Sequence, residues 1–443
     1  MNIKSIKINC YKSIKNPIEL DLNLINTFIG QNNSGKSNIL DAIELCINPE
    51  KDNSLLFYDK SDIILNIEFT EDEIKEFSFP NSRANLILKN KKRILLFEEM
   101  DFMYDNRISN YLSSKIKRLN EEVFLDLDST NKDFRSIFNY KQNFLEFQNN
   151  LKKHFPKIST TKNALDINYE HKGIKEGNRD ATIDWLGSGF SRIFTILLYI
   201  YHPEYNIIMI DEPENHLHPA MIRKLLWAMQ NSNSGQILFT THSPLFITPI
   251  SLPQLVRVAK EEGATRVFTI KNTNYTLDRL IKELNADNLE MFFSDEVVLV
   301  EGVSDKLLFT SLINNFYTGD KDIKVIQTYG KGNAVIYGEV LNIFNIPYIM
   351  IFDRDMLKGN YMNDLLNRID LKLKNVSGDN FVKELKKHRI FVLPNGDLEA
   401  NYPRKYQKYD SKSENALYAS SSITEEDFNS DKMKNLKEII SSL

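Results

Sequence analysis

Short apolar segments alternate with helical segments along most of the chain. In residues 3–8 and 18–29, isoleucine and leucine alternate with polar residues, a period of two that predicts β-strands. Continuous apolar runs at residues 206–211 and 235–243 predict strands buried on both faces of a parallel sheet. Residues 93–162 are charged, rich in Asn and Lys and mostly helical in pattern, so we expect a short helical insertion there. The alternation of strands and helices predicts an α/β fold.

A second α/β pattern follows a polar stretch. We expect strands at residues 296–300, 324–327 and 347–352, with helices at residues 304–313 and 334–344. The length of 443 residues suits two large domains. We therefore predict a first domain over residues 1–275, which contains the insertion, and a second parallel-sheet domain over residues 290–443.

Composition narrows the class of protein. Hydrophobic residues make up 42% of the chain and charged residues 26%, which excludes wholesale disorder. The net charge of −4 excludes a uniformly basic nucleic-acid coat, but it leaves room for a local basic patch. Cys10 and Cys46 are too few for a disulfide framework, and no apolar run approaches the about 18 residues that span a bilayer. We expect a soluble, cytoplasmic protein with no membrane partner.

A glycine-rich segment between a strand and a helix predicts an ATP site. Residues 30–37 follow the pattern G-x-x-x-x-G-K-[ST], whose glycines let successive backbone N–H groups face phosphate oxygens. Lys36 is expected to reach the β- and γ-phosphates, and Ser37 to offer its hydroxyl to Mg²⁺. A chance glycine turn is the alternative, which the flanking strand and helix disfavour. The residues assigned to ATP binding are Gly30, Asn32, Asn33, Ser34, Gly35, Lys36, Ser37 and Asn38.

Two further strands end in polar residues that suit the same site. The strand at residues 206–211 ends at Asp211, which we expect to bind the nucleotide's Mg²⁺. Glu212 follows it and is a candidate general base for the attacking water. A later strand ends just before His242, which would lie at the same edge and contact the γ-phosphate. A lone histidine is more often structural, but its place after a third apolar strand favours a functional role.

Ser188 and Gly189 complete a set of four motifs. They lie in a Gly-Ser-Gly sequence before an apolar helix, a pattern that alone is typical of an ordinary loop. With the other three motifs in this order, it resembles the signature sequence of ABC-type ATPases of the SMC-like and RecF-like branch. The resemblance implies that Ser188 and Gly189 bind ATP held by another subunit, so that the ATPase heads form a homodimer or higher homo-oligomer.

Acidic residues follow the strands of the second domain. Glu301 ends one strand and Asp305 opens the next helix, while Asp353 and Asp355 follow another strand. Carboxylates at the carboxyl ends of parallel strands converge on one crevice, and oxygen ligands suit a hard divalent cation. Solvated loop carboxylates are the alternative for any one of them, but the combined pattern favours a metal site.

This acidic pattern resembles the Toprim domain of topoisomerases, primases and a class of nucleases. A later strand-like run adds Asp397 and Glu399 as metal ligands. An SMC-like ATPase followed by a Toprim domain is similar to the OLD (overcoming lysogenization defect) family of endonucleases, which includes the nuclease subunit of the Gabija anti-phage system. The resemblance implies two-metal cleavage of DNA with Mg²⁺, or Mn²⁺ or Ca²⁺ in its place. The catalytic residues are then Glu301, Asp353, Asp355 and a C-terminal lysine, for which Lys412 is the candidate.

A DNA substrate requires a basic path to these acids. Lysine and arginine residues near the last acidic residues could contact the DNA backbone without recognising its sequence, although each alone is as readily a solvated surface charge. They are Lys372, Lys374, Lys383, Lys386, Lys387, Arg389, Arg404, Lys405 and Lys408.

Two functions of different classes remain open. The first is an ATP-hydrolysing, divalent-metal-dependent endonuclease that acts on DNA in defence against phage, with a companion defence protein or RNA as its trigger. The second is an ATP-driven switch that binds DNA or a partner, with the Toprim region as a docking module. The intact acids favour the first. A topoisomerase or primase fits less well, because an SMC-like ATPase ahead of the acids is not their arrangement.

Overall fold

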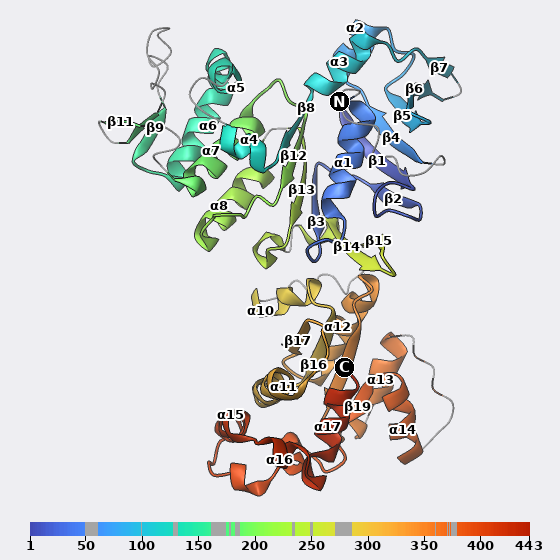
Figure 1. Ribbon diagram of the computed structural model, residues 1–443, viewed down its shortest axis with the longest axis vertical. Helices are drawn as coiled ribbons and strands as arrows, with labels where there is room; N and C mark the ends of the chain where they lie inside the picture. The colour runs from blue at the N-terminus through green and yellow to red at the C-terminus, as the bar shows by residue number, and fades with distance from the viewer. Residues whose placement is uncertain are drawn as a thin grey trace. The chain divides into compact units, whose positions relative to one another are not determined.

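The computed structural model divides the chain into two compact units, residues 1–269 and 270–443, each with its own apolar core (Figure 1). Both units combine helices with sheets, which confirms the predicted α/β class. The structure describes residues 1–48, 61–98, 100–126, 132–160, 174–176, 179–181, 187–232, 235–248, 251–270, 286–358, 360–369, 371, 373 and 379–443.

The first unit is built around a six-stranded sheet in the order β15-β14-β3-β13-β12-β8. All neighbours pair in parallel except β15, which is antiparallel to β14. Ile207 and Met209 of β12 face one core and Ile208 and Ile210 face the other, so the sheet is buried on both sides. The strands are β3 (Ile25–Ile29), β8 (Ile116–Leu119), β12 (Ile207–Asp211), β13 (Gln236–Thr241), β14 (Leu255–Glu261) and β15 (Ala264–Thr269).

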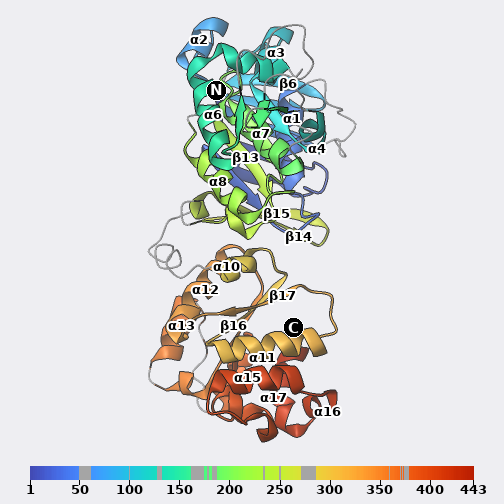
Figure 2. The same ribbon diagram turned by 90° about the vertical axis from the view of Figure 1, so that its left-hand side faces the viewer.

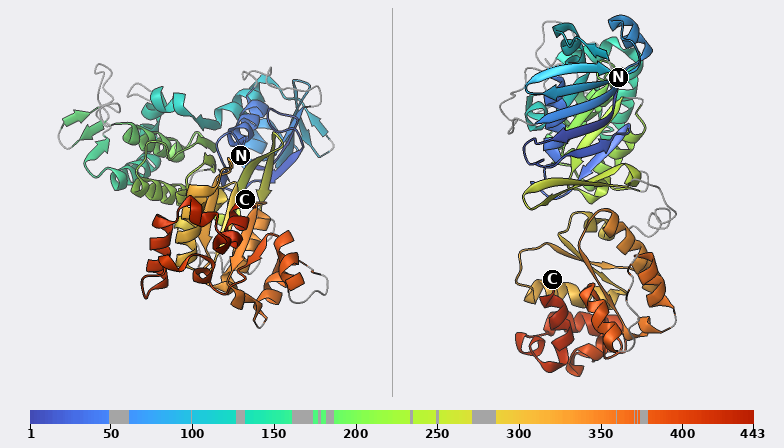
Figure 3. Two further views of the ribbon diagram at one scale, coloured as in Figure 1. Left: turned by 60° about the horizontal axis from the view of Figure 1, so that its bottom comes forward. Right: turned by 90° about the vertical axis from the view of Figure 1, so that its right-hand side faces the viewer.

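A second, antiparallel sheet in the order β2-β1-β4-β5-β6-β7 covers helix α1 (Lys36–Ile47), as the right-hand view of Figure 3 shows. Ile39, Ile43 and Cys46 recur at helical spacing and are buried between the two sheets. This packing fixes the start of α1, where the predicted nucleotide loop ends. The strands are β1 (Asn2–Asn9), β2 (Ile18–Asp21), β4 (Asp62–Glu68), β5 (Arg83–Lys89), β6 (Lys92–Phe97) and β7 (Met100–Phe102).

Residues 93–162, expected to form a helical insertion, are mixed where the structure describes them. They include most of β6, then β7, β8 and β9 (Ile158–Thr160), as well as α3 (Asn106–Ser114), α4 (Glu121–Asp126), α5 (Lys132–Ser136) and α6 (Lys141–His154). The segment expected to be a helical insertion therefore contains strands as well as helices, and β8 was hard to recognise because its four residues, Ile-Lys-Arg-Leu, are too few for a clear period. Pairing with β12 nevertheless makes β8 an edge of the central sheet.

A second apolar core covers the other face of the central sheet. Helices α7 and α8 bury apolar residues there together with α6. The remaining elements are α2 (Glu71–Phe77), α7 (Ser188–Tyr201), α8 (Pro219–Gln230), β10 (Ile174–Glu176) and β11 (Arg179–Ala181), of which β10 and β11 form a small antiparallel sheet with β9.

The second unit contains a parallel sheet in the order β17-β16-β18-β19. Helix α11 packs beside α15 and α17, and α12 packs beside α13 (Figure 2). The strands are β16 (Glu296–Val300), β17 (Ile323–Gln327), β18 (Tyr348–Phe352) and β19 (Ile390–Val392). The helices are α10 (Ala286–Leu289), α11 (Val303–Phe316), α12 (Lys331–Ile343), α13 (Tyr361–Arg368), α14 (Asp379–Lys387), α15 (Lys412–Ser422), α16 (Glu425–Phe428) and α17 (Lys434–Ser441).

Across the described ranges of both units, we find no helix whose length and apolar character would let it cross a membrane.

Candidate active sites

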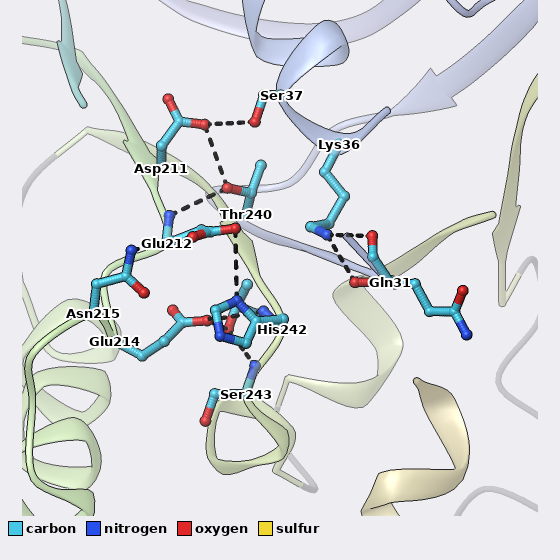
Figure 4. A network of polar contacts seen from close by, with 12 residues as sticks. Gln31, Lys36, Ser37, Asp211, Glu212, Glu214, Asn215, Thr240, His242 and Ser243 are labelled. Carbon is cyan, nitrogen blue, oxygen red and sulfur yellow. Dashed lines mark hydrogen bonds and ion pairs between the residues drawn. The ribbon is translucent and has the colours of Figure 1, made fainter. Parts of the chain in front are cut away.

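The predicted nucleotide loop connects β3 to α1. Gly30 and Gly35 have φ angles of +147° and +103°, which favour glycine, and a Cβ on Gly30 would lie 2.0 Å from the carbonyl oxygen of Val258. Lys36 begins α1, and its Nζ donates to the carbonyl oxygens of Gly30 (2.7 Å) and Gln31 (2.8 Å), as Figure 4 shows. The loop is therefore curled around a buried ammonium group.

Residues distant in the sequence support this loop from outside. Thr265 of β15 donates its hydroxyl to the carbonyl oxygen of Ser34 (2.9 Å), and its Oγ1 lies 2.7 Å from Oγ of Ser13. Asn38 donates to the same Ser13 oxygen (2.6 Å). Asn32 and Asn33 are exposed. The Ser34 carbonyl and the Asn38 side chain are thus held by Thr265 and Ser13, which lie outside the loop.

Asp211 lies next to Ser37, at the end of β12. The Ser37 hydroxyl donates to Oδ1 of Asp211 (3.0 Å), and the Thr240 hydroxyl lies 3.4 Å from the same oxygen. Nε of Arg118 donates to the other carboxylate oxygen (2.8 Å). The two residues predicted to hold the nucleotide's Mg²⁺ are therefore adjacent, and their oxygen donors fit such an ion.

Arg118 was not among the residues expected from the sequence. It reaches from β8 to Asp211, to Asp41 and, over 3.3 Å, to Glu44 of α1. Burial alone would lower the pKa of its guanidinium. The negative charges of Asp211 and Asp41 have the larger combined effect, so the pKa of Arg118 lies above its ordinary value. The only sequence signal was a basic residue inside a short apolar strand.

Glu212 lies in a cluster of polar groups with Glu214, Asn215 and His242 (Figure 4). Its Oε2 accepts from the amide of Asn215 (3.1 Å), and Nδ1 of His242 lies 3.6 Å from its Oε1. Nδ1 of His242 is also 3.3 Å from Glu214, whose buried carboxylate accepts from the backbone N–H of His242 (2.8 Å) and the Thr241 hydroxyl (2.7 Å). Glu214 was missed, although it follows Glu212 by two residues. It orients His242.

The charges of this cluster also act on the nucleotide loop. Burial lowers the pKa of Lys36, and the carboxylates of Glu212 and Glu214 oppose that effect. A charged lysine within a glycine-rich loop at the start of a helix is suited to bind a polyanion such as a triphosphate.

The predicted signature residues begin α7. Ser188 is exposed at the first position of the helix, and Gly189 follows with a Cβ position 3.0 Å from the carbonyl oxygen of His216. One turn later, the buried Arg192 donates to the backbone carbonyls of Glu212 (2.9 Å) and Asp211 (3.3 Å). The signature helix is therefore bonded to the backbone of the candidate base.

In the second unit, acidic side chains meet at the carboxyl ends of the parallel strands. Glu301 follows β16 and Asp353 follows β18, and the backbone N–H of Asp353 donates to Oε1 of Glu301 (3.2 Å). The Asp305 carboxylate accepts from the N–H of Gly302 (2.9 Å) at the start of α11. The sheet topology thus brings these carboxylates together, as the strand-end rule predicts.

Burial disfavours the ionised forms of three of these carboxylates. It raises the pKa of Glu301 to about 7, that of Asp305 to about 6 and that of Asp353 to about 7. Neighbouring carboxylates add to each rise, and these electrostatic neighbours include Asp355, Asp397 and Glu399. All six predicted acids therefore lie within one site, where a cation would relieve their repulsion.

Two lysines neutralise the outer acids. Nζ of Lys412 lies 2.8 Å from Asp397 and 3.7 Å from Glu399, and Nζ of Lys331 lies 2.5 Å from Asp355. Lys331 was not expected, although it begins α12 between two glycines, shortly after β17 at the same sheet edge. A cavity of about 680 Å³ opens here, lined by Asp353, Arg354, Asp355, Leu357, Lys358, Gly396, Asp397 and Lys412.

The six acids have the right donor atoms for a divalent cation, but their carboxylates are too far apart to bind one together. Among the side chains that the structure describes, no three carboxylate, histidine or cysteine groups are close enough to hold a metal ion as they stand. All six candidates are hard oxygen donors, however, and Oε1 of Glu399 is buried without a hydrogen-bond partner. The donor set suits Mg²⁺ or Mn²⁺ once the carboxylates draw together.

The structure describes seven of the nine basic residues expected to form a DNA path. Several of its residues form ion pairs with nearby carboxylates, and Lys408 donates to the Tyr418 hydroxyl (2.7 Å). The pairs are Lys386–Glu438, Lys387–Glu384, Arg389–Glu296 and Lys405–Asp427. Lys383 and Arg404 are exposed. Lys372 and Lys374 lie outside the described residues. The sequence could not show the pairs of Lys386, Arg389 and Lys405, whose partners are distant along the chain, whereas Lys387 pairs with Glu384 within α14.

Two family models match the chain in this order. Residues 46–248 match the family described as "AAA domain, putative AbiEii toxin, Type IV TA system". Residues 292–355 match the family described as "Overcoming lysogenization defect protein-like, TOPRIM domain".

Similar proteins carry related names. An OLD nuclease of Thermus scotoductus is 27% identical over 34% of this chain and 31% of its own length. Endonuclease GajA of Bacillus cereus (strain HuB5-5) is 22% identical over 55% of this chain and 43% of its own length. A solved SMC head bound to a winged-helix domain of ScpA has a TM-score of 0.47 and 14% identity, over 61% of this chain and 98% of that one. The chain spans less than half the length of these two curated relatives.

Proposed function

The chain carries the domain pair of the OLD family, an AAA-type ATPase domain followed by an OLD-like Toprim domain, and on this premise we propose that it is an ATP-hydrolysing, divalent-metal-dependent endonuclease that cleaves DNA in defence against phage. The observation that carries the proposal is the group of six carboxylates near the strand ends of the second unit, where burial, reinforced by the neighbouring carboxylates, raises the pKa values of Glu301, Asp305 and Asp353. A module that only docks on a partner does not need such a group.

In the first unit, we assign ATP to the loop before α1. Lys36 and the loop N–H groups would bind the phosphates, and Ser37 with Asp211 would hold Mg²⁺. Glu212 would accept a proton from water, and Glu214 would keep His242 oriented beside it. Ser188, exposed at the start of α7, would bind the ATP of a second copy in a homodimer of heads.

In the second unit, Glu301, Asp305, Asp353, Asp355, Asp397 and Glu399 would hold the metal. A bound divalent cation stabilises negative charge on the attacking and leaving oxygens of a phosphodiester. Lys412, which pairs with Asp397, would then be released toward the phosphate and stabilise its charge. Glu301, between β16 and β18, would complete the metal site or accept a proton.

Plasmid cleavage tests the nuclease. Purified protein is incubated with plasmid and Mg²⁺ or Mn²⁺, with and without ATP. We expect nicks or breaks with wild-type protein, none with Glu301→Gln, and undiminished cleavage with Asp364→Asn, an exposed carboxylate of α13. Full cleavage by Glu301→Gln, or none by wild type in any condition, contradicts the proposal. Lys36→Ala should abolish ATP hydrolysis, measured as phosphate release.

One observation favours a second candidate, an ATP-driven switch whose Toprim unit docks on DNA or a partner. Lys331 and Lys412 already neutralise outer acids, and no three described carboxylates are grouped to hold an ion. Persistent ATP hydrolysis with tight DNA or partner binding and no strand cleavage would select this alternative.

A further inference from the structure

Large apolar side chains are exposed beside the acidic site, where solvated polar residues are the rule. Val303, Tyr329 and Tyr361 are 48%, 54% and 56% exposed. Val303 begins α11 two residues after Glu301, Tyr329 follows β17, and Tyr361 begins α13 shortly after Asp355. All three therefore come from the segments that carry or adjoin the strand ends of the acidic site.

One cation connects an exposed ring to the acids. Nζ of Lys331 is 2.5 Å from Oδ2 of Asp355 and 5.8 Å from the centre of the Tyr361 ring. The Lys331 side chain is only 19% exposed, so it is held in this position. The Tyr361 ring is therefore within a side-chain length of a carboxylate of the site.

Tyr329 is held in a conformation that a bulky residue rarely adopts. Its φ is +56°, in the left-handed region, and the next residue, Gly330, has φ of +119°. The N–H of Gly330 donates to the carbonyl oxygen of Glu301 (3.2 Å), which ties this turn to β16. Strained residues of this kind gather at functional sites, where the surrounding fold maintains them.

Resting on the proposed function, we propose that Tyr329 and Tyr361 stack on unpaired bases beside the phosphate that the carboxylates act on, so that the Toprim unit acts on single-stranded or locally unpaired DNA. Every base has a flat π-face, so aromatic rings bind bases with little sequence preference. In an intact duplex those faces are covered by neighbouring base pairs. Lys331, between the Tyr361 ring and Asp355, is placed to contact the intervening backbone phosphate.

A binding measurement tests the stacking site directly. The full chain with Glu301→Gln, which prevents cleavage, is titrated into a 20-nucleotide single strand carrying 2-aminopurine, and into the matching duplex, with Mg²⁺ present. We expect Tyr329→Ala and Tyr361→Ala each to weaken single-strand binding about 5- to 100-fold and duplex binding less than about twofold. Phenylalanine at either position should restore binding and the fluorescence change, because the ring is kept.

Controls separate this inference from the proposed function. Trp227→Ala removes a comparably exposed ring (49%) from α8 in the first unit and should change neither affinity. Equal losses on duplex and single strand, no loss in either alanine variant, or no rescue by phenylalanine overturns the stacking site. If wild-type protein still cleaves duplex DNA in those cases, the nuclease stands and only this inference fails. If wild-type protein neither binds nor cleaves DNA, both fail.

Discussion

At the scale of single residues, the molecule concentrates buried charge at its two sites and balances it differently in each. In the ATPase unit, the acids around the nucleotide loop have a cationic partner, because Arg118 reaches Asp211, Asp41 and Glu44. In the Toprim unit, Glu301 and Asp353 retain pKa values of about 7 because burial and like charges leave their ionised forms unstable. Arg118 therefore balances three acids of the first site, whereas in the second site Lys331 and Lys412 pair with outer acids and a cation would favour the ionised forms of Glu301 and Asp353.

The acidic cluster predicts a pH dependence of stability. Because the folded pKa of Glu301 is above its unfolded value, the folded protein keeps a proton that the unfolded chain releases between about pH 4 and 7. This contribution to stability is complete below the unfolded pKa and is lost as the pH rises to about 7. Glu301→Gln should therefore raise the Tm of metal-free protein at pH 8 and leave it nearly unchanged at pH 4.

Calorimetry from pH 4 to 8 measures this effect. Asp364→Asn, the exposed control, should follow wild type at every pH. Added Mn²⁺ should stabilise wild-type protein more at pH 8 than at pH 5.5, since the ionised carboxylates bind the ion. A Tm gain for Glu301→Gln that does not vary with pH contradicts the assignment.

Arg118 predicts a large loss on substitution. Arg118→Gln leaves Asp211, Asp41 and Glu44 close together without their shared cation, and its side chain is only 12% exposed. Removing one partner of a buried ion pair costs about 3–5 kcal/mol, so we expect the free energy of unfolding, from urea titration, to fall by about 3 kcal/mol. Arg83→Gln, which breaks an exposed pair with Glu68, should cost about 0–1 kcal/mol. If the two substitutions lowered the free energy of unfolding equally, the Arg118 contacts would contribute no more than an exposed ion pair.

At the scale of elements, strand ends and helix starts were predictable where the residues that define them are consecutive in the sequence. The glycine loop with Lys36, and the acids after β16 and β18, follow from a strand, a turn and a helix in sequence. Arg118, Glu214 and Lys331 could not be assigned because their partners lie on other elements. β8 and the ion pair of Lys386 with Glu438 were missed for the same reason, because both depend on contacts between segments distant in the sequence.

Two glycines, one in the nucleotide loop and one in α12 of the second unit, predict opposite effects of substitution. Gly30→Ala places a Cβ 2.0 Å from the carbonyl oxygen of Val258 at a φ of +147°, so we expect a lower Tm and loss of ATP binding. Gly332→Ala lies in α12 where a Cβ meets nothing within 4 Å, and it should raise stability by about 0.5–1 kcal/mol. Thermal unfolding and a fluorescent ATP analogue measure both. Tight ATP binding by Gly30→Ala would refute the loop assignment.

At the scale of the whole molecule, two units with separate cores should unfold as separate events. We expect two calorimetric transitions. ATP with Mg²⁺ should raise the first unit's transition in a Glu212→Gln variant, which retains ATP, and Lys36→Ala should remove that shift. Mn²⁺ should raise the other, and Glu301→Gln should remove that shift. A single transition that responds equally to both ligands would contradict independent units.

The two hydrogen bonds of Arg192 have a mechanical consequence. They join the second turn of α7 to the main chain of Asp211 and Glu212, so a shift of the helix is passed to the end of the strand. Any partner that pulls on the exposed tip of α7 therefore also displaces the peptide that carries the candidate base. The Arg192 guanidinium thereby couples a contact at the exposed start of α7 to the position of the candidate base, Glu212.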